Sequence, residues 1–111
     1  MVKEIPIQMV VQQVVNDFAL EVTTPPQSEE ELLDLLGDVV AYLIEKRLEY
    51  LMQILYTMDV DENAMRYAFS DEHDQPVNMI LAHAILEREK QKAQTRLEYR
   101  PETPRDWSED F

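Results

Sequence analysis

Acidic and amide side chains alternate in the stretch "DVDENA", where they could bind a metal ion. Asp59, Asp61 and Asn63 have the spacing of the first three ligands of an EF-hand calcium loop. That loop also needs a glycine at its sixth position and a bidentate glutamate at its twelfth, and Ala64 and Ser70 occupy those positions here. Without them, the sharp turn and two of the ligand oxygens are lost. We therefore interpret the stretch as the end of one helix followed by the N-terminal cap of the next.

The two histidines are also candidate metal ligands, because His73 lies among the carboxylates of "DEHD". However, His83 is ten residues later and Pro76 lies between them, so they do not form the i, i+4 pair of a helical metal site. Neither histidine follows a glutamate by three residues, as the di-iron helical bundles require. We expect His73 in a surface loop, His83 on the flank of a helix, and no metal at either.

Carboxylates are concentrated in "EEELLDLLGDVVAYLIE" (29–45). Glu31 and Asp34 form an E-x-x-D pair on one face of a predicted helix, and Asp38 follows in "GDVV". This stretch resembles a segment of the MazG-like nucleoside triphosphate pyrophosphohydrolases, which are small, all-α and oligomeric. The resemblance implies a magnesium-dependent hydrolase in which Glu31 and Asp34, together with Asp38, hold the metal against the substrate phosphates.

The resemblance covers about 17 of the 111 residues. The family's E-x-x-E motif on the preceding helix has no counterpart, because no two of the upstream acids Glu4, Asp17 and Glu21 are three residues apart. Two carboxylates alone bind Mg²⁺ weakly. The alternative interpretation is structural: Ser28 caps the helix, and Glu31 completes a capping box. On balance we expect no catalytic residues and no cofactor.

The composition excludes several other classes of function. The chain has no cysteine, which excludes disulfides, thiolate zinc sites and a cysteine nucleophile. Its net charge of −13 would repel nucleic acid and anionic membranes. No apolar run approaches the roughly 18 residues of a membrane span, and we expect no signal segment. We therefore expect a cytoplasmic protein that binds neither nucleic acid nor membrane directly.

Apolar residues at helical spacing, and the presence of only one glycine, predict an all-α fold rather than a β-fold rich in glycine turns. Helices are predicted at residues 7–20, 29–58 and 62–69 and from Pro76 onward, with a proline-containing linker at 23–27 and a polar loop at 70–75. We expect one domain over residues 1–97, built as a three- to four-helix bundle with one long central helix.

The predicted helix 29–58 is apolar on two faces and unusually long. It would span about 45 Å, whereas a compact domain of this size is roughly 34 Å across. Either the helix breaks near the charged stretch 45–49, or it protrudes and packs against a second copy of the chain. We expect protrusion and a homodimer. The face expected to form that interface contains Leu33, Leu36, Val40, Ile44, Leu48, Leu51 and Leu55.

The C-terminal part of the chain is polar. The apolar face of the last helix ends near Ile85, so we expect residues 87–96 to be solvated or laid along an acidic partner surface. Residues 98–111 are predicted to form an irregular tail, in which Trp107 and Phe111 are candidate anchors for a partner.

Charge is distributed unevenly along the chain. Residues 1–45 carry a net charge of −8 and residues 86–105 a net charge of +2, so the two regions could pair within one chain or between chains. The middle of the chain, "YLMQILYTMDVDENAM", also resembles small helical bacterial proteins, which implies an all-α fold and no particular activity. We predict a non-catalytic protein-interaction or regulatory module that forms a homodimer and can bind a basic protein surface. The alternative is the magnesium-dependent pyrophosphohydrolase.

Overall fold

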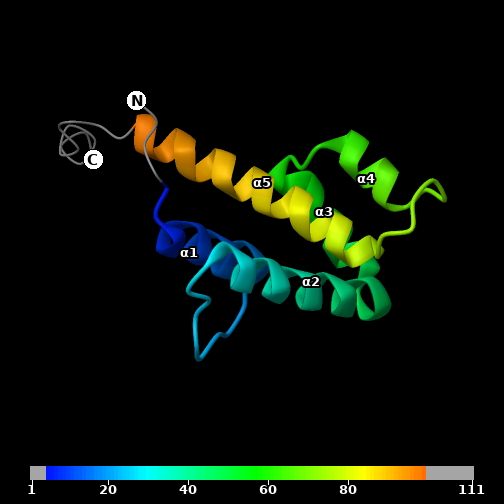
Figure 1. Ribbon diagram of the computed structural model, residues 1–111, viewed down its shortest axis with the longest axis horizontal. Helices are drawn as coiled ribbons and strands as arrows, with labels where there is room; N and C mark the ends of the chain where they lie inside the picture. Colours follow the sequence, from blue (N-terminus) through cyan, green and yellow to red (C-terminus); the bar gives the residue numbers. More distant parts are fainter. Residues whose placement is uncertain (1–4, 100–111) are drawn as a thin grey trace.

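The computed structural model describes residues 5–99, which form helices joined by loops and contain no strand (Figure 1). The helices are α1 (Ile7–Phe18), α2 (Glu29–Lys46), α3 (Leu48–Met58), α4 (Glu62–Ala68) and α5 (Val77–Glu98). This confirms the all-α prediction. The expected number of three or four helices was wrong, because the described residues form five.

Local sequence signals set the starts of the helices. Pro6 and Pro76 directly precede α1 and α5 in extended backbone, at positions where a helix needs no N–H. Ser28 caps α2, and its Oγ accepts a hydrogen bond from the Glu31 N–H at 3.1 Å. Three glutamates in the first turn of α2 complement the positive end of the helix dipole.

The predicted helix 29–58 is broken at Arg47, whose φ of −149° and ψ of 60° lie outside the helical region. The expectation of one protruding helix was therefore wrong, and the break lies inside the charged stretch 45–49. The backbone stays hydrogen-bonded across it, since the Arg47 N–H donates to Leu43 O at 2.8 Å and Arg47 O accepts from the Leu51 N–H at 3.1 Å. The Arg47 guanidinium lies 4.3 Å from the centre of the Tyr50 ring.

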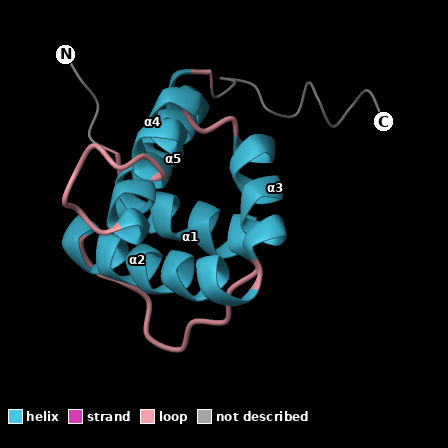
Figure 2. Cartoon of the chain, turned by 90° about the vertical axis from the view of Figure 1, so that its right-hand side faces the viewer, coloured by secondary structure: helices cyan, strands magenta, loops and turns pink. Residues whose placement is uncertain are grey.

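Burial of the residues after Arg47 explains the break. Leu51 and Leu55 in α3 are fully buried within this single chain. The helix that α2 packs against, α5, is only about 33 Å long. If α2 continued straight, residues 48–58 would extend past the N-terminal end of α5. The apolar side chains of these residues would then be exposed to water. The break instead turns α3 back toward the core (Figure 2).

The last helix, α5, is the centre of the packing, since it contacts α1, α2 and α4 (Figures 1 and 2). It packs tightly against Gly37 of α2, because a Cβ atom added to Gly37 would lie only 2.6 Å from the sulfur of Met79 in α5. The Asn78 side-chain amide also donates to the Gly37 carbonyl at 3.1 Å. The largest fully buried side chains are Leu32, Leu36, Leu51, Leu55, Leu81, Ile85 and Glu89.

Residues 87–96 of α5 were expected to be solvated or laid along an acidic partner surface. Instead, this polar half of α5 packs on α1 of the same chain. Glu89 and Ala93 are both fully buried there. Lys92 pairs with Asp17 of α1 at 2.7 Å, and Lys90 pairs with Glu29 of α2 at 3.1 Å. The acidic front of the chain and its basic end therefore pair within one molecule.

In the part of the chain that the structure describes, no helix is long and apolar enough to cross a membrane. The predicted tail of residues 98–111 includes Glu98, the last residue of α5, and Tyr99. The remainder of that tail, with Trp107 and Phe111, lies outside the described residues.

Candidate functional site

The carboxylates expected in the enzyme interpretation lie exposed on α2. Glu31 lies in the first turn, where its Oε1 accepts a hydrogen bond from the Gln27 N–H at 2.8 Å. Asp34 and Asp38 follow on the exposed surface of the same helix. Within residues 5–99, no three acidic or histidine side chains gather closely enough to hold a metal ion. The Ser28 cap is confirmed, but Glu31 bonds the N–H of Gln27 rather than that of Ser28, so the second hydrogen bond of the predicted capping box is displaced by one residue.

The "DVDENA" stretch forms a turn between two helices, as we interpreted it. Asp59 ends α3 in the left-handed conformation, with φ of 64°, and its N–H donates to the carbonyls of Leu55 and Tyr56. Asp61 caps α4, and its Oδ1 accepts a hydrogen bond from the Asn63 N–H at 2.9 Å. Both aspartates therefore have structural roles at helix ends.

The two histidines lie apart. His73 is half-buried in the loop after α4, with its Nε2 3.1 Å from Ala68 O and its ring 4.6 Å from the Tyr67 ring. A proton on Nε2 makes this contact a hydrogen bond to the carbonyl that ends α4. His83 is exposed on α5, which agrees with the expected position on a helix flank.

The face expected to form a homodimer interface is divided between the core and the surface. Leu36, Val40, Leu51 and Leu55 are fully buried in the core of the single chain, so they have no surface to offer a second copy. Two others are partly buried and packed against that core: Leu33 and Ile44. Only Leu48 is well exposed, at 45%.

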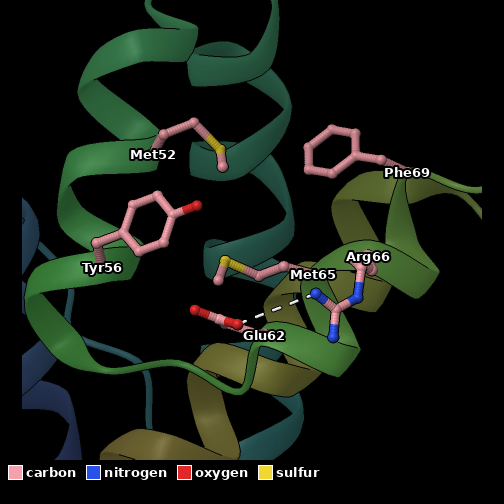
Figure 3. A pocket seen from close by; sticks show the side chains of 6 residues that line it. All are labelled: Met52, Tyr56, Glu62, Met65, Arg66 and Phe69. Atoms are coloured by element: carbon pink, nitrogen blue, oxygen red, sulfur yellow. Dashed lines mark ion pairs between the residues drawn. The ribbon is translucent and has the colours of Figure 1, made fainter.

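A different apolar surface lies between α3 and α4 (Figure 3). Met52 and Tyr56 from α3 face Met65 and Phe69 from α4 across a hollow of about 330 Å³. The floor is the buried Met65, whereas Tyr56 and Phe69 are 61% and 46% exposed. We call this hollow and its four apolar side chains the α3–α4 groove.

Three polar groups line the α3–α4 groove, namely the Tyr56 hydroxyl, the Glu62 carboxylate and the Arg66 guanidinium (Figure 3). Glu62 and Arg66 lie on successive turns of α4 and form an ion pair of 4.0 Å, with both side chains largely exposed. An exposed pair of this kind contributes about 0–1 kcal/mol and leaves the groove floor apolar.

The two segments share a sequence repeat, and the methionine and the aromatic residue of each line the α3–α4 groove, whereas Glu49 and Gln53 of α3 do not. Residues 49–56 ("EYLMQILY") and 62–69 ("ENAMRYAF") each place a glutamate, a methionine, a polar residue and an aromatic residue at positions one, four, five and eight. These positions fall on one face of a helix. The repeat was visible in the sequence, but a search for catalytic and metal-binding patterns does not find it.

A buried polar cluster joins α1 to α5 on another side of the molecule. The Gln13 side-chain amide donates to both the backbone carbonyl and the Oε1 of Glu89, each at 2.8 Å. Gln13 is 2% exposed and Glu89 is fully buried. Lys92 Nζ lies 3.6 Å from Glu89 Oε1 and 2.7 Å from Asp17 Oδ2, so it connects the two carboxylates.

The protonation of the two carboxyl groups in this cluster is coupled. The pKa of Glu89 is raised to about 7, chiefly by burial and also by the neighbouring Asp17 carboxylate, whereas Lys92 and Gln13 act to lower it. Burial also raises the pKa of Asp17, but hydrogen bonds with Glu89 and Lys92 and the charges of Lys92 and Arg96 outweigh it, so this pKa is lowered. A neutral Glu89 carboxyl next to a charged Asp17 is the favoured arrangement.

Three kinds of comparison with known proteins gave no relative. No protein-family model, no curated protein and no solved structure matches this chain. The functional argument therefore rests on the side chains and their positions.

Proposed function

We propose that this protein is a non-catalytic protein-interaction module. The observation that carries the proposal is the α3–α4 groove, with aromatic side chains exposed on an acidic molecule. Large aromatic side chains are usually buried, and an exposed cluster of them around a hollow is typical of a binding surface. Tyr56 and Phe69 are the two residues of the groove that belong to the exposed large hydrophobic side chains of the described residues.

A homodimer was expected from the apolar stripe of residues 33–55, and the core now accounts for four of its seven leucine, isoleucine and valine side chains. The net charge of −13 also opposes contact between two copies. We therefore propose a different protein, with a basic surface, as the principal partner. Self-association is the competing outcome of the experiment below.

The test is purification of the tagged full-length chain from its native cells, with the stoichiometry of co-purifying proteins measured. We expect one protein to co-purify in a fixed molar ratio and to dissociate as salt is raised, because the contact is partly electrostatic. Recovery of the chain alone, as a monomer or a dimer, contradicts the proposal.

The pyrophosphohydrolase alternative needs its own assay. Purified protein is incubated with nucleoside triphosphates and Mg²⁺, beside a variant in which Glu31 and Asp34 are both alanine. If the protein is an interaction module, neither sample releases pyrophosphate. Magnesium-dependent hydrolysis that the double variant loses would establish the enzyme instead.

A further inference from the structure

We propose that the α3–α4 groove binds an amphipathic helix of a partner protein, with two large apolar side chains about one turn apart and lysine or arginine residues beside them. This inference rests on the proposed function and specifies its site and the chemistry of its partner. It is argued from the side chains in the groove, their spacing and the charge around them.

The side chains in the groove favour a helix as the occupant. Met52 and Tyr56 lie four residues apart on α3, and Met65 lies four residues before Phe69, the C-cap residue of α4, a spacing of about one turn or 6 Å along a helix axis. A bound helix with apolar side chains at i and i+3 or i+4 has the same repeat, so both anchors can enter together. Within residues 5–99 there is no strand edge to which an extended peptide could add.

The two methionines at the groove suit insertion of apolar side chains. A methionine side chain is unbranched and polarizable, so Met52 and Met65 can adjust to the shape of an inserted group. Tyr56 and Phe69 stand on opposite walls and can close over its sides (Figure 3). Aromatic residues in such positions supply much of the binding energy at protein interfaces.

Charge selects a basic partner. Residues 48–76 contain seven acidic residues and one basic residue, Arg66, which gives this region a net charge of −6. Among the basic residues of α5, Lys90 and Lys92 pair with Glu29 and Asp17. Arg88 donates to the Met58 carbonyl and lies beside Asp59 and Asp61, so it offsets one of these negative charges. Most of the negative charge of residues 48–76 is therefore not neutralised by α5. A second copy of this chain would bring the same negative charge to the interface.

The experiment uses the full-length protein and three synthetic peptides. The first is an 18-residue helix (about five turns) with leucine at i, i+3, i+4 and i+7 and lysine on the flanks. The second has the same composition with the leucines redistributed around the helix. The third has glutamate in place of lysine. Methyl NMR of the methionines reports the site of binding, because Met52 and Met65 line the groove and Met9, Met58 and Met79 do not.

We expect the first peptide to shift the Met52 and Met65 methyl signals and to leave those of Met9, Met58 and Met79 nearly unchanged. The Tyr56→Ala and Phe69→Ala variants should each bind this peptide about tenfold more weakly. Tyr42→Ala is the matched control, because Tyr42 is 58% exposed on α2, away from the groove, and its loss should not alter binding. The second and third peptides should bind at least about tenfold more weakly than the first.

Three results would overturn the inference. The first is the absence of any shift at Met52 and Met65 at roughly 1 mM of the first peptide. The second is equal binding of the redistributed or the glutamate peptide. The third is a dimer of the protein alone that the Phe69→Ala substitution dissociates, which would assign the groove to a second copy.

The outcomes also separate this inference from the proposed function. If a native partner co-purifies equally well with Tyr56→Ala and Phe69→Ala, the protein is an interaction module and the assignment of the groove is wrong. If no partner co-purifies with the unaltered chain, the proposed function itself fails.

Discussion

Glu89 is the residue whose environment departs furthest from that of an ordinary surface carboxyl. It is fully buried between α5 and α1, it accepts a hydrogen bond from Gln13, and its Oε2 has no partner among the described residues. A buried charge without full compensation is expensive, so the group keeps a proton instead. Burial is the largest cause of the raised pKa of Glu89, which is about 7.

This burial predicts how stability depends on pH. Between pH 4.5 and about 7, folded Glu89 holds a proton that the unfolded chain has released. The contribution of Glu89 to the free energy of unfolding is therefore complete below pH 4.5 and is lost as pH rises through about 7. We expect Glu89→Gln, which cannot ionise, to be more stable than the unaltered protein at pH 8 by on the order of 2 kcal/mol. Urea unfolding at several pH values measures the difference.

Glu87→Gln is the matched control for this substitution. Glu87 is exposed on the same helix, two residues before Glu89, so its replacement removes the same charge without the burial. We expect its stability to follow that of the unaltered protein across the pH range. If the curves of all three proteins are parallel between pH 4.5 and 7, Glu89 does not hold a proton in the folded state.

At the scale of the helix, α1 and α3 both end in a backbone conformation that most residue types disfavour. Both end at a residue with positive φ, Ala19 at 52° and Asp59 at 64°. Aspartate tolerates this left-handed conformation, whereas alanine is disfavoured there by about 1–2 kcal/mol because of its Cβ. Glycine is the residue usually found at such a position.

The same substitution should therefore have opposite effects at two alanines. Ala19→Gly relieves the Cβ contact at the end of α1 and should raise the free energy of unfolding by about 0.5–1 kcal/mol. Ala41→Gly, at an exposed position inside α2, should lower it by about 1 kcal/mol, because glycine loses more backbone entropy in a helix. Chemical unfolding followed by circular dichroism measures both. A lower stability of Ala19→Gly would show that the end of α1 is not strained.

The sequence predicted where helices start better than it predicted which helices pack against one another. Ser28 and Pro76 are local signals, and the structure uses both at helix starts. The break at Arg47 carries no proline or glycine and depends on where α5 ends, which is a property of the packed molecule. The burial of Glu89 escaped prediction because its partner Gln13 is also polar, so neither residue adds to a hydrophobic pattern.

The candidate sites were predicted only in part, for the same physical reason. Capping by Ser28 and Asp61 depends on neighbours within three residues, and the sequence contains those neighbours. The α3–α4 groove depends on how two helices meet, so the exposure of Tyr56 and Phe69 could not be deduced from helical spacing alone.

At the scale of the whole molecule, the dominant feature is negative charge. The net charge is −13, and only a few of the acidic groups have a basic partner among the described residues. Repulsion between like charges opposes the compact state, whereas each exposed ion pair adds only about 0–1 kcal/mol. We therefore expect repulsion among the acidic side chains to outweigh the attraction of the ion pairs in the folded protein.

Salt should consequently stabilise this protein. We expect the midpoint temperature of unfolding to rise between about 0.01 M and about 0.1 M NaCl, as the Debye length falls from about 30 Å to about 10 Å. A double variant, Glu45→Lys with Glu72→Lys, tests the cause, because each substitution removes one negative charge and adds one positive charge, which changes the net charge from −13 to −9. Its midpoint should rise less with salt. A midpoint that falls with salt in both proteins would mean that ion pairs dominate.

The central position of α5 has a consequence for how the chain is made. Translation delivers α1, α2 and α4 before α5, yet all three bury their apolar sides against it. Until α5 leaves the ribosome, the leucines of α2 have no lasting cover, and the contact between α1 and α5 must close a loop of more than 70 residues. We therefore expect this core to form only after α5 has been synthesised, and the nascent chain to expose apolar segments of the kind that chaperones bind until then.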